Sequence, residues 1–291
     1  MNLAASAFLA WLASTAAAAP APMQANAPAA VPADQQQPYD ARVNPAQPDF
    51  TIVGLPTTLP VPRGKSAFRV THRFQRPLGS GDFGDLLNDF FGFDAGAQIG
   101  LEFRLGVLRG TQAGIHRTND KTIEFFVQQD VLRQGEGRAF GLAAFGAIEG
   151  INNFRDEYAP TLGAVLSREF GRSLAVYVAP LWIGNTNPIP DDHVDEDDVP
   201  HDDSDYTVLV GVGARWRMRP TVYLVAEISP RAAGYDPGVS QASIGIEKRV
   251  GGHAFQLNVS NAFGTTPAQI ARGGSSNDNW YIGFNISRKF F

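Results

Sequence analysis

The sequence predicts an all-β protein: a transmembrane, antiparallel, up-and-down β-barrel of about 12 strands, closed by pairing of the first strand with the last. Most segments that read as strands are 9–13 residues long, whereas a tilted strand needs ~9–11 residues to cross the hydrocarbon layer and soluble strands average ~5–6. Short and long connections alternate along the chain, and so do apolar and polar residues within each strand. These three observations together are typical of barrels that span a membrane.

Composition narrows the class further. The chain has 291 residues and no cysteine, which excludes a disulfide scaffold and thiolate metal sites. No apolar run of about 18 residues follows the N-terminal leader, so the sequence does not predict membrane-spanning helices. The net charge of −5 is small, and basic patches interleaved with aromatic residues are absent, so we expect no nucleic-acid partner. The sequence indicates no cofactor.

The first 62 residues form two segments of unusual composition. Residues 1–19 resemble a secretory signal peptide, because an apolar run from Leu3 to Ala13 precedes the small residues Ala16–Ala19. Residues 20–62 carry 10 of the 20 prolines, together with Ala and Gln. Such a composition buries little apolar surface, so we expect a disordered linker, lying in the periplasm once the leader is removed. The barrel would then span residues 63–291.

Twelve strands are expected from the alternation. They cover about 67–76, 95–105, 108–117, 121–133, 138–150, 159–170, 173–182, 206–217, 221–229, 241–250, 253–262 and 279–290. The segment 83–91 has the pattern of a short amphipathic helix, whose apolar face would plug the barrel mouth or pack on its rim.

The connections predict the orientation. Tight turns at Leu105–Leu108, Gln134–Gly137, Phe170–Ser173, Met218–Pro220 and Val250–His253 alternate with longer ones, such as 77–94 and 183–205. Outer-membrane barrels have short periplasmic turns and long external loops. With an even number of strands, both the N-terminal linker and the C-terminus would therefore lie in the periplasm.

Charged residues fall on the strand face opposite the apolar one. Ions facing lipid at the midplane cost ~2–4 kcal/mol for Arg or Lys, so this face should line the lumen. Two interpretations remain open: a packed lumen of mutually paired charges, or a wet pore whose charges set selectivity. The candidate lumen charges are Arg69, Arg73, Glu102, Arg104, Glu124, Asp130, Arg215, Arg217, Glu227, Glu247 and Arg249.

The terminal segment, Asn279 to Phe291, is a strand with one apolar face, interrupted by Arg288. It resembles the terminal aromatic strand by which outer-membrane barrels are recognised by the assembly machinery. The candidate signal comprises Trp280, Ile282, Phe284, Ile286, Phe290 and Phe291, with Phe291 one step out of phase. Barrel closure would place Phe290 near Phe68, and Trp280 near Phe74 to Arg76.

Four segments, spread from the first strand to the last, resemble one family of bacterial outer-membrane β-barrels, the domain of unknown function number 5777. They are FRVTHRF at 68–74, FDAGAQIGLE at 93–102, NAFGTTPAQI at 261–270 and NWYIGFNISRKF at 279–290. The resemblance covers about residues 68–291. It implies a β-barrel in the outer-membrane lipid and brings no catalytic residues with it.

An acidic stretch lies in the loop 187–205, which holds nine Asp and Glu residues. Carboxylates suit divalent cations such as Ca²⁺ or Mg²⁺, and imidazoles add affinity for a transition metal. No EF-hand spacing is present, and runs of like charge are usually solvated loops. Both interpretations stay open, and the candidate ligands are Asp191, Asp192, His193, Asp195, Asp197, Asp198 and His201.

Three functions are compatible with these observations. The first is a channel or passive uptake protein for a small solute. The second is a closed structural or docking barrel that binds a periplasmic or surface partner. The third, a surface hydrolase, would need a nucleophile beside His72 on the outer face, and no Ser with a recognisable motif accompanies it. We therefore expect no enzyme activity.

Overall fold

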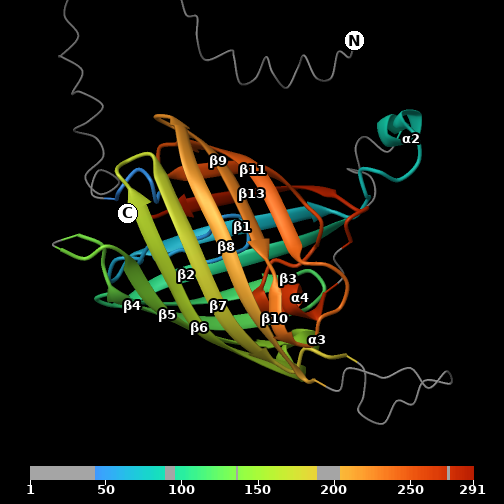
Figure 1. The fold of residues 1–291 in the computed structure, drawn as a ribbon, viewed down its shortest axis with the longest axis horizontal. Helices are drawn as coiled ribbons and strands as arrows, with labels where there is room; N and C mark the ends of the chain where they lie inside the picture. The colour runs from blue at the N-terminus through green and yellow to red at the C-terminus, as the bar shows by residue number, and fades with distance from the viewer. Residues whose placement is uncertain (1–42, 89–95, 136, 189–203, 274–275) are drawn as a thin grey trace, which may run out of the picture. The chain divides into compact units, whose positions relative to one another are not determined.

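The computed structural model describes residues 43–88, 96–135, 137–188, 204–273 and 276–291. The expected signal peptide, and residues 20–42 of the expected linker, lie outside these residues. The described chain forms one antiparallel sheet of thirteen strands that closes on itself (Figure 1). Among the described residues no helix is long and apolar enough to cross a membrane.

Each of the twelve expected strands is present, and one short strand, β10, is added. The strands are β1 (Ser66–Phe74), β2 (Ala97–Leu108), β3 (Thr111–Thr118), β4 (Ile123–Leu132), β5 (Gly141–Gly150), β6 (Asp156–Phe170), β7 (Leu174–Gly184), β8 (Tyr206–Arg219), β9 (Val222–Ser229), β10 (Arg231–Gly234), β11 (Gln241–Val250), β12 (His253–Ser260) and β13 (Tyr281–Lys289). β10 pairs with β8 at the barrel rim and is not one of the twelve strands that form the closed barrel.

Closure occurs where the first and last strands meet, as expected. β13 pairs antiparallel with both β1 and β12, and β8 pairs with β9 to complete the ring. The register agrees with the expected one to within two residues, and Trp280 lies near the far end of β1, where the Leu78 N–H donates to its carbonyl oxygen at 2.7 Å. Phe68 lies opposite Arg288, and the Phe290 N–H donates to Ser66 O at 2.9 Å. Alternation fixes which face a residue takes, but a shift of two keeps every side chain on its face, so the pattern predicts the register only to within two residues.

The two faces of the wall follow the alternation. On β2, Leu101 and Phe103 are 48 % and 42 % exposed, whereas the intervening Glu102 and Arg104 are 3 % and 4 % exposed. The same contrast holds around the ring, and Trp182, Tyr206 and Trp216 are all exposed near strand ends. An apolar outer belt with aromatic rims is what a lipid environment requires.

The connections separate the barrel into two ends. The short-turn end carries the turns at 109–110, 133–140, 171–173, 220–221 and 251–252, together with the start of β1 and the end of β13. Gly171 and Gly251 have φ of 62° and 59° in these turns, a conformation that favours glycine. The remaining connections define the long-loop end.

The expectation of a disordered linker is wrong for residues 44–62, which lie inside the barrel. Here the chain forms a hairpin: the Ile52 N–H donates to Leu55 O at 2.9 Å, and the Thr57 N–H donates to Phe50 O at 2.8 Å. Ala46, Ile52 and Val61 are fully buried. We call residues 44–62 the plug. Composition failed here because the surface that buries these side chains belongs to strands distant in the sequence.

The long-loop end is covered by a helix that the sequence pattern did not predict. In α4 (Pro267–Arg272), the Thr266 side chain caps the N-terminus by accepting from the Gln269 N–H. Ala268, Ile270 and Ala271 pack in one cluster with inward residues of β4 to β8. The expected amphipathic helix does form, as α2 (Phe83–Asn88), but its Phe83 is 52 % exposed, so it does not fill the mouth. The short α3 (Ile151–Phe154) is a turn of left-handed residues.

Candidate functional site

The lumen is the candidate site, because strand alternation gathers the charged residues there. Eight of the eleven candidate lumen charges are buried in the interior. They are Arg69, Arg73, Glu102, Arg104, Glu124, Arg215, Glu227 and Glu247. The other three lie near strand ends and are partly exposed: Asp130, Arg217 and Arg249.

Most of the buried charges are paired. Arg69 Nη2 lies 2.7 Å from Glu102 Oε2, and Arg104 forms a second ion pair with the same carboxylate. On the facing wall, Arg215 Nη2 lies 2.9 Å from Glu247 Oε2. Removing one partner of a buried pair leaves an uncompensated charge, which is costly. These pairs therefore fix the wall around the plug.

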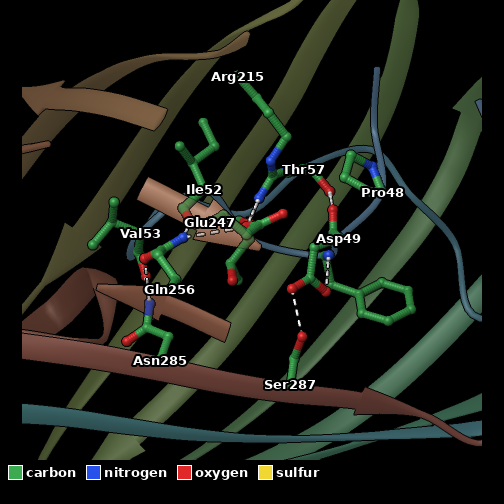
Figure 2. A network of polar contacts seen from close by, with 12 residues as sticks. Pro48, Asp49, Ile52, Val53, Thr57, Arg215, Glu247, Gln256, Asn285 and Ser287 are labelled. Carbon is green, nitrogen blue, oxygen red and sulfur yellow. Dashed lines mark hydrogen bonds and ion pairs between the residues drawn. The ribbon is translucent and has the colours of Figure 1, made fainter. Parts of the chain in front are cut away.

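The wall holds the plug mainly through the backbone carbonyl groups of the hairpin. Gln256 Nε2 donates to Ile52 O at 2.7 Å, and Asn285 Nδ2 donates to Val53 O at 2.9 Å (Figure 2). The same arrangement recurs along the hairpin, at Arg215 to Thr51 O (2.7 Å), Gln128 to Thr57 O (2.9 Å), Gln112 to Leu59 O (3.2 Å) and Lys289 to Pro48 O.

The tip of the hairpin is bound in the opposite sense, by a carboxylate. Glu227 accepts the N–H groups of Val53, Gly54 and Leu55, at 2.9 to 3.0 Å. Successive backbone N–H groups of this kind form a concave site for an anion. At Gly54 an added Cβ would lie 3.3 Å from Glu227 Oε1 and 3.6 Å from the Ile270 δ-carbon. The plug tip therefore lies against α4 inside the lumen.

Apolar contacts complete the fit. Ile52 and Leu55 rest on two glycines of β8, where an added Cβ would lie 2.3 Å from the Ile52 δ-carbon at Gly213 and 2.5 Å from a Leu55 δ-carbon at Gly211. Nearer the short-turn end, Phe50 packs edge-on against Phe291, with ring centroids 6.5 Å apart. A larger residue at Gly211 or Gly213 would overlap the side chains of Leu55 or Ile52.

Two cavities adjoin the plug in the described part of the chain. A cavity of about 20 Å³ lies between the tip of the plug and α4, among Thr51, Glu102, His116 and Pro267. It has room for roughly one water molecule. A second cavity of about 290 Å³ lies at the short-turn end, between Gln47, Thr58 and the wall residues Asp130 and Glu169. In this conformation the plug occupies the lumen and most of the buried charges are paired, which is nearer to the first of the two interpretations of the sequence.

Sequence reasoning missed the uncharged half of this site. Gln112, Gln128, Gln256 and Asn285 all point inward, and their positions in the strand alternation would have revealed them. The plug gave a weaker signal: Phe50, Ile52 and Leu55 stand among the prolines. Their partners could not be inferred, because up to 241 positions of the sequence separate the bonded groups.

Two further expectations concerned a metal site in the acidic loop and the role of His72. The candidate metal ligands from Asp191 to His201 lie outside the described residues. In the described part of the chain, no group of three or more His, Asp or Glu side chains could hold a metal ion. His72 stacks on Phe284, with centroids 4.7 Å apart, and its Nδ1 has no hydrogen-bond partner among the described residues. It is a packing residue of the outer face.

The candidate assembly residues lie on β13 and directly beside it. Ile282, Phe284 and Ile286 take the outer face, and Phe290 is 49 % exposed. Phe291 turns the other way and packs on the plug. The step out of phase in the sequence thus corresponds to a change of partner, from lipid to the hairpin.

The chain belongs to a family described as the membrane bound beta barrel domain (DUF5777), whose model matches residues 49–290. The match begins within the plug, so the hairpin is part of the family domain. With its apolar outer belt, the protein is a β-barrel of the outer membrane, in contact with membrane lipid.

Solved structures resemble the chain in outline. The KdgM porin in complex with disordered oligogalacturonate is 8 % identical, with a TM-score of 0.47, over 77 % of this chain and 99 % of that one. Outer membrane phospholipase A from Escherichia coli is 13 % identical, with a TM-score of 0.39, over 78 % of this chain and 90 % of that one. No curated protein matches. At these TM-scores neither a solute nor a reaction is transferred to this chain.

Proposed function

We propose that this outer-membrane barrel is a channel for a small polar solute, closed by its own plug, and that the plug leaves the lumen when the channel opens. The observation that carries the proposal is the chemistry of the wall around the hairpin. The plug is held by Arg, Gln, Asn and Lys side chains that water or a polar solute can also satisfy. A lumen filled permanently would be stabilised better by apolar packing than by buried polar groups.

The plug can also leave without dismantling the barrel. It contributes no strand to the ring of twelve, and beyond residue 62 a single bridge joins Arg63 to Gly106. Each hydrogen bond exchanged for one to water costs about 0.5–1.5 kcal/mol net, and exposing each of Phe50, Ile52 and Leu55 costs about 1.5–3 kcal/mol. The backbone entropy that the released segment regains, about 1–2 kcal/mol per residue, offsets these costs.

The finer assignments follow from this proposal. Residues 1–19 direct secretion, and the short-turn end, with the plug entrance and the C-terminus, faces the periplasm. The barrel assembly machinery reads the last strand. The buried wall charges set the selectivity of the open lumen, and the protein catalyses no reaction. Divalent cations at loop 187–205 remain a sequence-based hypothesis.

Conductance in planar bilayers tests the proposal. We expect the full chain to conduct rarely, and a variant lacking residues 20–62 behind an intact leader to conduct continuously. A variant lacking only residues 20–42 is the matched control, because it keeps the hairpin and should remain closed. If the variant without residues 20–62 assembles, shown by heat-modifiable migration, and still does not conduct, the channel assignment is wrong and the docking barrel takes its place.

A further inference from the structure

Two arginines face the membrane at the short-turn end. Arg288 interrupts the outward apolar face of β13, and Arg168 occupies the equivalent face of β6; both are exposed. Neither guanidinium has an ion-pair partner among the described residues, although most charges within the wall do. An unpaired cation on the lipid-facing surface needs an explanation in the membrane itself.

The two sites share one local arrangement, Arg-x-Phe at the end of a strand. The guanidinium carbon of Arg168 lies 5.1 Å from the ring centroid of Phe170, and that of Arg288 lies 5.3 Å from the ring centroid of Phe290. Both rings are nearly half exposed. A guanidinium over an aromatic face is held by the ring quadrupole, so each arginine is oriented at the outer surface.

The depth of both sites agrees with the lipid head-group region. Arg288 lies opposite His253, the first residue of β12, and Arg168 lies opposite Val176, two residues into β7. At a rise of about 3.4 Å per residue, both are within a short distance of the rim. An outward Arg costs ~2–4 kcal/mol at the midplane but only ~0–1 near the interface.

Around Arg288 the surface has a second polar group and an apolar floor. Arg288 Nη1 lies 3.0 Å from His253 Nε2, and the His253 ring stacks on Phe255 at 5.9 Å. Phe255 and Leu257, further along the same face, are exposed. Inward of Phe290, the order along this face is the Arg288–His253 pair and then Phe255 and Leu257. A cation followed inward by apolar side chains matches the order of phosphate and acyl chain in a phospholipid.

We propose that Arg168 and Arg288 each bind the phosphate of an anionic phospholipid head group, in the leaflet at the short-turn end, and so fix the depth of the barrel at two separate points of its rim. Arg supplies a planar pair of N–H donors that fits two phosphate oxygens. The Phe on the rim side of each arginine holds the guanidinium in place. The proposal does not depend on whether the lumen opens.

Native mass spectrometry of the full chain, released from nanodiscs of phosphatidylcholine with a minor fraction of phosphatidylglycerol, tests the proposal. Loss of a charge-assisted bond should weaken each site about tenfold. We therefore expect Arg168→Gln and Arg288→Gln each to lose one retained phosphatidylglycerol, and the double variant to lose two. Arg155→Gln removes the same charge from an exposed residue at the long-loop end and should change nothing.

Three outcomes would overturn the inference. Unchanged phosphatidylglycerol retention in the double variant would remove the two arginines from lipid binding. An equal loss in the Arg155→Gln control would reduce the effect to net charge. Displacement of the lipid by millimolar inorganic phosphate would indicate a site for free anions. Heat-modifiable migration of every variant confirms that the barrel is folded.

Discussion

The Glu227 carboxylate accepts the backbone N–H of Gly54 at 2.9 Å, across 173 positions of the sequence. This contact joins a strand of the ring to the tip of a hairpin that precedes the ring. One carboxylate thereby satisfies three consecutive N–H groups that would otherwise be buried without partners. The closed lumen depends on this kind of long-range pairing.

Replacing Glu227 by Gln should loosen the plug. The amide keeps the size of the side chain but loses the charge and one of the two acceptor oxygens that the N–H groups share. Charge-assisted bonds are roughly twice as strong as neutral ones, so we expect a loss of about 1–2 kcal/mol and at least a several-fold increase in open probability in bilayers. Glu124→Gln, a buried wall carboxylate with no described bond to the plug, is the control. Equal open probabilities for wild type and Glu227→Gln would contradict the role of Glu227.

Filling the two glycines of β8 should displace the hairpin. In the Gly211→Ala, Gly213→Ala double variant the new methyl groups would overlap Leu55 and Ile52, whose tips must move. We expect a destabilised plug, measured as faster proteolysis within residues 44–62, in a barrel that still assembles. Gly146→Ala is a matched control, because its nearest non-bonded atom would be 3.6 Å away. Equal cleavage rates in the double variant and the control would show that the glycines do not seat the plug.

A disulfide should lock the lumen shut. Thr58 Oγ1 of the plug lies 2.5 Å from Ser167 Oγ of β6, and the chain has no cysteine of its own. The Thr58→Cys, Ser167→Cys variant should form the bond under oxidising conditions and then stay closed, with conductance events returning on reduction. Each single cysteine variant should be insensitive to the redox conditions. Free opening of the oxidised double variant would mean that conduction does not require the plug to move.

The two C-terminal phenylalanines should separate in function. Phe290 faces outward, whereas Phe291 packs on Phe50. We expect Phe290→Ser to lower the amount of barrel recovered in the outer membrane, because it removes part of the aromatic end of the last strand. Phe291→Ser should leave assembly near normal and increase conductance, since burial of a Phe contributes about 1.5–3 kcal/mol. Outer-membrane fractionation with gel mobility, followed by bilayer recording, measures both. The reverse pattern would show that Phe291 is the assembly residue.

The sequence by itself determined the barrel. Strand length, the segregation of turns and loops, and the period-2 alternation are local properties, so they predicted twelve strands, their inner and outer faces, and closure of β1 on β13. The same alternation identified Glu102, Arg215 and Glu247 as inward charges, because the energetic penalty for facing lipid acts on each residue separately.

Only the tertiary structure decided what fills the barrel. Ile52 and Val53 sit in a proline-rich segment with the composition of a linker, and their burial depends on Gln256, Asn285 and a carboxylate elsewhere in the chain. The exact register of the closing strands and the position of helix α4 were decided in the same way. Composition measures how much apolar surface a segment carries. Whether that surface is buried depends on strands that come together only when the barrel closes. These contacts are non-local, so a local sequence pattern does not predict them.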